Sequence, residues 1–198
     1  MNFNAKLMIA IGLFILVLSL SQTANKQYDL VIANGRVIDP ETNLDAIKHV
    51  GINDGTISLI SDQPLSSSHT IDASGLVVAP GFIDVHSHTP TLLGQHVNLL
   101  DGVTTQLDLE AGSYPISFYG EHFRNGAKIN YGSSVGHWAV RTKVIEGRDM
   151  PYIFAGNQVL TMAGSTWMQP ATAEQIEQMR VLINLGLDEG GLGIGVLL

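Results

Sequence analysis

The chain has 198 residues, seven histidines, no cysteine and a formal net charge of −8. Without cysteine there can be no disulfide and no thiolate metal site, so a metal ion would need His, Asp, Glu or a modified Lys. Ten basic residues against eighteen acidic ones argue against a nucleic-acid-binding groove, which needs clustered Lys and Arg.

The N-terminus places Lys6 before the apolar run LMIAIGLFILVLSL, residues 7–20. A membrane-spanning helix needs about 20 apolar residues, and this shorter run is typical of a secretory signal. Ser19, Ser21 and Ala24 supply small residues for cleavage. We therefore expect residues 1–24 to be a signal peptide that directs export to the periplasm or the medium. The alternatives are an uncleaved anchor, which would be the chain's link to a membrane, and a buried helix.

Residues 26–79 have the pattern of a small β module. Short β-rich runs flank Asn34-Gly35 and again Asp54-Gly55, and both dipeptides are strong hairpin signals. The stretch SSSHTIDASGLVVAP then predicts a polar loop, a short strand and a further turn. This part of the chain is therefore predicted to be β structure without helices.

After Pro80 the pattern changes to strands that alternate with helices. The predicted strands cover residues 82–86, 103–110, 127–135 and 192–198. Helices are expected at residues 91–102, with Thr89-Pro90 at its start, at residues 116–125, and at residues 171–191. Thr172 and Gln175 have the spacing of a capping box for the last helix. The stretch 138–170 lacks a regular pattern and is expected to be an irregular lid or a source of substrate contacts.

Alternating strands and helices predict βα units with a parallel sheet. A closed (β/α)8 barrel takes about 250 residues, whereas residues 80–198 supply about four βα units. The final run LGIGVLL is an apolar strand with no turn or polar tail after it. We interpret the chain as a β module followed by the first half of a barrel. An independently folded half-barrel or an open α/β sheet is the alternative.

The stretch VVAPGFIDVHSH, residues 77–88, ends a predicted strand with two histidines one residue apart. Because side chains alternate along a strand, Asp84, His86 and His88 share one face. Their position at the carboxyl end of the strand is where barrel enzymes build their sites. Two imidazoles there can converge on one divalent metal ion, with Asp84 behind them as an orienting group. A pair of surface or hydrogen-bonded histidines is the alternative.

The same stretch, preceded by ANGRVIDP and GINDGTISLIS, resembles the start of the amidohydrolase superfamily. The motifs GVTTQLDLEAG, GHWAVR and EGGLGIGV resemble its N-acyl-D-amino-acid deacylase branch, which includes D-glutamate deacylases. The resemblance implies an α/β fold in which a small β-sandwich module precedes the N-terminal half of a metal-dependent-hydrolase TIM barrel.

The resemblance also implies site residues. His86 and His88 match the metal-binding histidine pair, and Glu110 stands where many deacylases have a bridging Cys. Asp108 shares the face of Glu110 but lies deeper in its strand, and an exposed strand-end carboxylate is the alternative for Glu110. His137 matches a position near the substrate or the metal shell, although a structural histidine is equally compatible.

The implied activity is hydrolysis of amide C–N bonds other than peptide bonds, with one or two Zn²⁺ ions and a small N-acyl-D-amino acid as substrate. Arg141 could clamp the substrate carboxylate, or form a surface ion pair instead. The superfamily's later histidine ligands and its aspartate base lie on strands five to eight, so no catalytic base is expected before Leu198.

Two other functions remain open at this point. One is hydrolysis of cyclic amides, as in dihydroorotases and hydantoinases. Hydantoinase-type relatives bridge their metals with a carboxylated lysine, and Lys128 and Lys143 lie at unsuitable places for that role, which favours the deacylase branch. The other is a catalytically inactive fragment that lacks the later ligands and the base.

Overall fold

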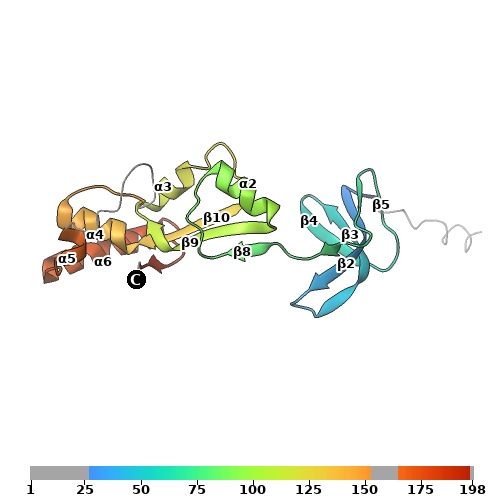
Figure 1. Ribbon diagram of the computed structural model, residues 1–198, viewed down its shortest axis with the longest axis horizontal. Helices are drawn as coiled ribbons and strands as arrows, with labels where there is room; N and C mark the ends of the chain where they lie inside the picture. Colours follow the sequence, from blue (N-terminus) through green and yellow to red (C-terminus); the bar gives the residue numbers. More distant parts are fainter. Residues whose placement is uncertain (1–26, 153–164, 197–198) are drawn as a thin grey trace, which may run out of the picture. The chain divides into compact units, whose positions relative to one another are not determined.

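The computed structural model describes residues 27–152 and 165–196, so the expected signal peptide lies outside the described residues. The chain divides into two compact units, residues 1–80 and residues 81–198, which we call the β unit and the α/β unit (Figure 1). Within the described ranges, no helix is both long enough and apolar enough to cross a membrane.

The β unit is built on a five-stranded sheet in which β4, β3, β2 and β6 pair in that order and β7 also pairs with β2. A further pair of short strands, β1 and β5, is parallel. The side chains of Val31, Val37 and Val50 are buried. The strands are β1 Gln27–Tyr28, β2 Leu30–Asp39, β3 Leu44–Asn53, β4 Thr56–Ser61, β5 Ser66–Ser67, β6 Thr70–Asp72 and β7 Val77–Val78.

The hairpin predicted at Asp54-Gly55 is confirmed, because these two residues join the antiparallel strands β3 and β4. Both have positive φ angles, 50° at Asp54 and 70° at Gly55, as the two central residues of a type I′ turn require. The sequence signal and the backbone geometry agree here because a β-turn depends on the backbone conformation of four consecutive residues.

The hairpin predicted at Asn34-Gly35 is wrong, because β2 runs straight through these residues. Pairing with β3 passes from Ile32–Val50 to Gly35–Lys48, so β2 holds one extra residue there, as a β-bulge does. Asn34 adopts a φ of 62°, and its amide nitrogen donates to Asp72. A left-handed residue suits a bulge as well as a turn, so the dipeptide alone does not distinguish the two.

The α/β unit contains a four-stranded parallel sheet whose strands follow chain order, β8, β9, β10 and β11. This confirms the prediction of a mixed α/β fold with a parallel sheet, while the first half of a TIM barrel and the β-sandwich module stay predictions. The strands are β8 Phe82–Asp84, β9 Val103–Ser113, β10 Asn130–Gly136 and β11 Ile194–Gly195.

Helices connect and cover these strands (Figure 1). The capping box predicted at Thr172 and Gln175 is confirmed at the start of α6. The start predicted for α2 is wrong by two residues, because the side chain of Thr91, not Thr89, accepts a hydrogen bond from the Gly94 amide. The helices are α2 Leu92–Leu100, α3 Ile116–Glu121, α4 His137–Glu146, α5 Ser165–Met168 and α6 Ala173–Asp188.

Helix α4 corrects the prediction that residues 138–170 are irregular; residues 153–164 of that stretch lie outside the described residues. Its buried residues, Trp138, Ala139, Val140 and Thr142, point to several sides of the helix. A helix covered on several sides has no polar face, so the apolar periodicity that marks a surface helix is absent. It ends at Gly147, whose φ of 63° is typical of a helix C-terminus.

Helix α4 holds the start of α5 through charged side chains at Thr166. Arg141 donates from Nε to the Thr166 carbonyl, and Glu146 accepts hydrogen bonds from the Thr166 amide and hydroxyl. These bonds, together with Arg148, lower the pKa of Glu146 to about 2. The Glu146 side chain is only 17% exposed, so solvent screens these bonds weakly.

We predict that Glu146→Gln destabilises the protein at neutral pH by about 1–2 kcal/mol, because a charge-assisted acceptor is replaced by a neutral one. The pKa of Glu146 is lower in the folded chain, so its contribution is complete above the ordinary glutamate value. It then falls as the pH drops toward about 2. Urea unfolding of both forms between pH 7 and pH 2.5 should therefore show a shrinking difference. Glu177→Gln, which alters an exposed pair with Arg180, is the matched control and should have a smaller effect. A Glu146→Gln penalty that does not change with pH would contradict this assignment.

Candidate metal centre

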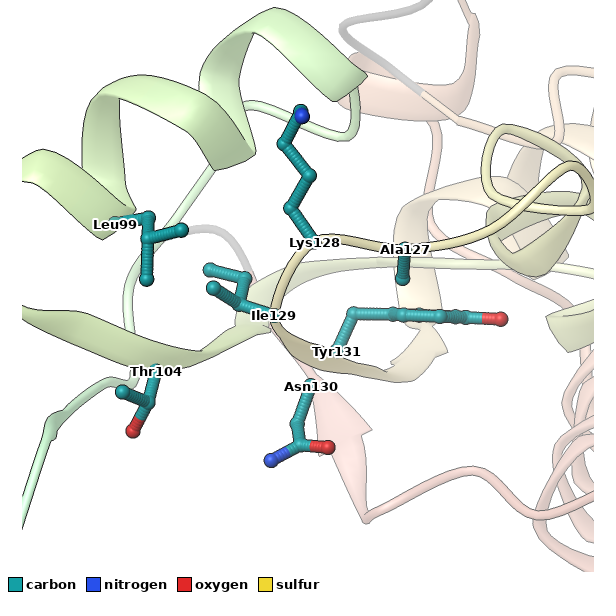
Figure 2. A pocket seen from close by; sticks show the side chains of 7 residues that line it. All are labelled: Leu99, Thr104, Ala127, Lys128, Ile129, Asn130 and Tyr131. Atoms are coloured by element: carbon teal, nitrogen blue, oxygen red, sulfur yellow. The ribbon is translucent and has the colours of Figure 1, made fainter. Parts of the chain in front are cut away.

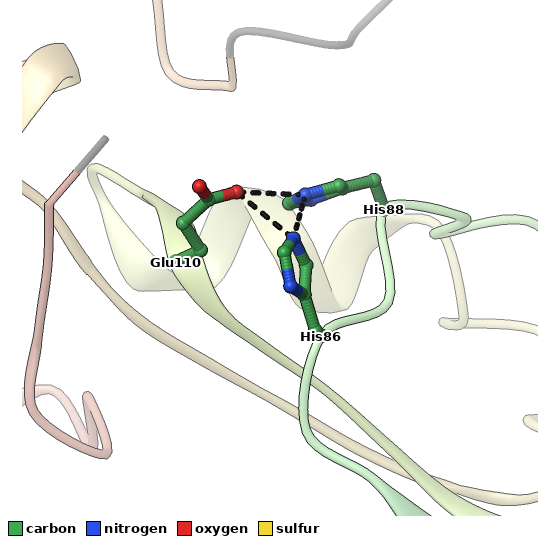
Figure 3. A group of neighbouring side chains, drawn as sticks. All are labelled: His86, His88 and Glu110. Carbon is green, nitrogen blue, oxygen red and sulfur yellow. Dashed lines mark hydrogen bonds and ion pairs between the residues drawn. The ribbon is translucent and has the colours of Figure 1, made fainter. Parts of the chain in front are cut away.

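Three side chains from two neighbouring strands of the α/β unit meet at one point (Figure 3). His86 and His88 lie on the segment after β8, and Glu110 lies in the last third of β9. The two Nε2 atoms are 2.9 Å apart, and each is 3.0 Å from Oε2 of Glu110. The structure thus brings together the three residues that the sequence singled out, and their role as metal ligands stays a prediction. We call them the triad.

The triad has the size and chemistry of a divalent-metal site. Ligand atoms about 2.0–2.1 Å from a tetrahedral zinc ion lie roughly 3.3 Å from one another, so a few tenths of an ångström of opening would admit the ion. Imidazole nitrogen and carboxylate oxygen are ligands that zinc accepts. The His86 side chain is 60% exposed and that of Glu110 34%, which leaves the triad open to an ion and to a small molecule.

Counting protons also points to a cation between the three atoms. His88 Nδ1 is 3.0 Å from Oδ2 of Asp108. As a carboxylate Asp108 can only accept, so Nδ1 is the donor of this pair, and in a neutral imidazole Nε2 then presents a lone pair. That lone pair, a Glu110 oxygen and His86 Nε2 then converge with at most one proton between them. A positive ion at their centre would relieve the repulsion between these acceptors.

Asp108 is the buried carboxylate behind the triad, with a side chain that is 0% exposed. Its Oδ1 accepts from the backbone amides of Ala111 at 3.0 Å and Gly112 at 3.1 Å. Its Oδ2 faces His88 and accepts from the Tyr152 hydroxyl at 2.6 Å. Four donors thus surround a charge that would otherwise be costly to bury.

The same carboxylate shapes the part of β9 that carries Glu110. Between the pairs Ser133–Asp108 and Val135–Ser113, β10 advances two residues and β9 advances five. Three extra residues therefore leave the ladder as a bulge, with Gly112 at a φ of 66°. Glu110 belongs to this bulge. The hydrogen bonds from the backbone amides of Ala111 and Gly112 to Asp108 therefore help to set the position of Glu110.

Asp84 has a different role from the one predicted. The sequence pattern places it behind the imidazoles, but its Oδ1 accepts from the His86 backbone amide at 3.0 Å. It therefore orients the main chain between the strand and the first histidine, while Asp108 contacts the imidazole of the second. Strand β8 ends at Asp84, earlier than the predicted His86, because this side chain turns the backbone.

His137 and Arg141 lie together in a second place. Both line a cavity of about 520 Å³ with α6 side chains that include Met179 and Ile183. Burial, and secondarily the positive charge of Arg141, lower the pKa of His137. Two donors of Arg141 are engaged by the carbonyls of Thr166 and Gln169. Contact of either residue with a substrate stays a prediction.

The two lysines that were weighed as metal-bridging residues, Lys128 and Lys143, are not part of the triad. Lys128 lines a cavity of about 520 Å³ with Leu99 and Thr104, beside the amino ends of β9 and β10 (Figure 2). Glu110 is near the opposite end of β9, so Lys128 is at the wrong end for a bridging ligand. Lys143, on α4, pairs with Asp149.

Sequence reasoning missed two members of this arrangement. Asp108 was recognised only as a neighbour of Glu110 on the same strand face, and its i−2 spacing was the signal available. Tyr152 comes from a segment 44 residues further along the chain. No local pattern connects such distant positions, so only the folded backbone shows that the phenol meets the carboxylate.

Comparison with known proteins gives the chain a family. The model of the amidohydrolase family matches residues 69–195. A D-aminoacylase from Alcaligenes xylosoxydans xylosoxydans is 29% identical over 88% of this chain, and a dihydroorotase from Streptococcus pneumoniae is 48% identical over 30% of it. The chain spans 39% of the length of the first relative and 14% of the second.

Solved structures agree with this relationship. A crystal structure of D-aminoacylase superposes with a TM-score of 0.65 at 26% identity, covering 85% of this chain and 38% of that one. An N-acyl-D-glutamate deacylase from Bordetella bronchiseptica, complexed with zinc and a phosphonate inhibitor, has a similar fold, with a TM-score of 0.58 at 22% identity. This match covers 86% of the present chain and 38% of the deacylase chain. The match over residues 69–195 includes the triad and both of its supporting aspartates, and the chain belongs to the amidohydrolase family.

Proposed function

We propose that this protein is a metal-dependent hydrolase of amide C–N bonds and that it deacylates N-acyl-D-amino acids. The observation that carries the proposal is the convergence of His86, His88 and Glu110 at 2.9–3.0 Å in a chain of the amidohydrolase family. Two imidazoles and a carboxylate at one exposed point are a donor set for a divalent cation.

In this proposal the two Nε2 atoms and Glu110 hold a divalent ion, for which we propose zinc. Such an ion, when bound, polarises an amide carbonyl and acidifies water. The protein's own contribution is positional: Asp84 fixes the backbone before His86, and Asp108 fixes the ring of His88. Because Asp108 is fully buried, it cannot itself exchange a proton with a substrate.

The preference for N-acyl-D-amino acids rests on the relatives. The D-aminoacylase matches along most of this chain, whereas the dihydroorotase matches 60 residues. Hydrolysis of a cyclic amide is the second candidate, favoured by the higher identity, 48%, of that short match. The position of Lys128 at the opposite end of β9 from Glu110 counts against a bridging lysine, so we propose the cyclic-amide reaction only as the second candidate.

Loss of one triad ligand should weaken metal binding. We predict that Glu110→Ala lowers zinc affinity by more than about tenfold, because even changes outside the first ligand shell commonly cost about 10–100-fold. Elemental analysis after dialysis and titration against a chelator would measure this. Glu121→Ala removes an exposed carboxylate that pairs with Arg124 and is the control. Equal zinc content in both variants would remove Glu110 from the site.

The substrate class can be tested with the zinc-loaded chain. If these 198 residues hydrolyse an amide, the proposal predicts release of free amino acid from N-acetyl-D-amino acids, and little from N-acetyl-L-amino acids, dihydroorotate or hydantoin. Turnover of the cyclic amides alone would favour the second candidate. A fully metal-loaded chain with no turnover of any of the four would contradict hydrolysis by these 198 residues and favour the inactive alternative.

We further propose that the protein is exported, on the strength of Lys6 and the apolar run of residues 7–20. Expression in a Gram-negative host should give a periplasmic or secreted product whose first residue is Asn25. Amino-terminal sequencing of the fractionated protein measures this directly. A cytosolic product that retains residues 1–24 would contradict export, and a membrane-bound one would indicate an uncleaved anchor.

A further inference from the structure

We propose that Asp108, positioned by Tyr152, selects the nitrogen of His88 that faces the metal. The inference rests on the proposed metal centre and adds two positioning residues to it. Neither touches the substrate. Asp108 and Tyr152 act through His88, and their effect should appear in the protonation pattern of that ring even before any metal is added.

The two oxygens of Asp108 have separate tasks. Oδ1 accepts from the amides of Ala111 and Gly112 and so belongs to the bulge of β9. Oδ2 lies 3.0 Å from His88 Nδ1 and 2.6 Å from the Tyr152 hydroxyl. A substitution that changes only the second oxygen would therefore alter the histidine and leave the bulge in place.

The tautomer of His88 follows from this contact. A neutral imidazole carries its proton on only one of its two ring nitrogens. The hydrogen bonds that the two nitrogens make decide which of them is protonated. Both ring nitrogens have a carboxylate oxygen at 3.0 Å, Asp108 at Nδ1 and Glu110 at Nε2. Asp108 is fully buried and held by its other donors, whereas Glu110 is 34% exposed and open to water or to an ion. The buried acceptor therefore places the proton on Nδ1, and Nε2 keeps its lone pair toward Glu110 and His86. If Nδ1 met a donor instead, Nε2 would carry the proton and could not bind a cation.

Tyr152 holds Oδ2 in position. Its side chain is 1% exposed within a cluster that includes Tyr119 and Trp138. The backbone on its N-terminal side is tied to the sheet, since Pro151 accepts a hydrogen bond from the Tyr114 amide at 2.9 Å. Burial and the neighbouring carboxylate raise the pKa of the Tyr152 phenol, so the hydroxyl keeps its proton and remains a donor to Asp108.

Asp108→Asn is the decisive variant because its amide can adopt only one orientation. The two backbone donors at Oδ1 require the amide oxygen at that position. The amide nitrogen must then take the place of Oδ2, where it donates to His88 Nδ1. The substitution is isosteric, yet it replaces an acceptor by a donor at the histidine and should reverse the tautomer.

The experiment compares five forms of the full chain: wild type, Asp108→Asn, Tyr152→Phe, the double variant of these two, and Tyr119→Phe. Long-range ¹H–¹⁵N correlation spectra of the metal-free chain, assigned with a His88→Gln variant, report the tautomer. Titration with Zn²⁺ against a chelator reports affinity. Tyr119 is a matched control because it belongs to the same cluster, and none of the described hydrogen bonds of Asp108 or His88 involves its hydroxyl.

We expect the wild type to carry the His88 proton on Nδ1 and Asp108→Asn to carry it on Nε2, with zinc affinity reduced at least about tenfold. Tyr152→Phe should keep the wild-type tautomer and lose affinity severalfold, and this loss should vanish in the Asp108→Asn background. Tyr119→Phe should match the wild type in both measurements.

Two results would overturn the inference. An unchanged tautomer in folded Asp108→Asn would remove the role of Asp108, and equal affinities of Tyr152→Phe and Tyr119→Phe would remove that of Tyr152. Failure of the wild type to bind zinc would instead contradict the metal centre, and the spectra of the metal-free chain would still decide the tautomer. The two failures are therefore distinguishable.

Discussion

The arrangement of the site depends on one buried negative charge. Asp108 has no exposed surface, and a charge in that position is tolerated only when donors surround it. Its donors come from the bulge of β9, from His88 after β8, and from Tyr152 far along the chain. Satisfying the carboxylate therefore brings three separate segments to one place. Loss of any donor would leave part of the charge uncompensated, so these segments are coupled through a single side chain.

The parallel sheet turns this constraint into a possible metal centre. Neighbouring parallel strands point the same way, so the segment after β8 lies beside the last part of β9. The bulge supplies the finer adjustment, because three extra residues release Glu110 from the ladder. The imidazoles of His86 and His88 and this carboxylate can then approach to 3.0 Å or less. The strand order brings the two segments side by side, and the hydrogen bonds of Asp108 then set the positions of the side chains on them.

Different parts of the α/β unit have different roles. Helix α4 is buried on several sides and uses Arg141 and Glu146 to hold Thr166, which is a structural role. Lys128 and its cavity lie beside the amino ends of β9 and β10, at the other end of β9 from Glu110. The exposed triad is thus the part of the described chain where a metal ion and a small amide could meet.

Sequence patterns were sufficient wherever the cause of a structure is local. The pair of histidines after an apolar strand, the turn at Asp54-Gly55 and the capping box at Thr172 each depend on residues within a few positions of one another, and the structure shows all of them. Tertiary structure decided the rest. Asn34 forms a bulge because a partner strand continues past it, and Asp108 meets Tyr152 because packing joins positions 44 residues apart. A one-dimensional pattern records which conformations a residue can adopt, whereas the burial of a charge selects which distant groups must come together.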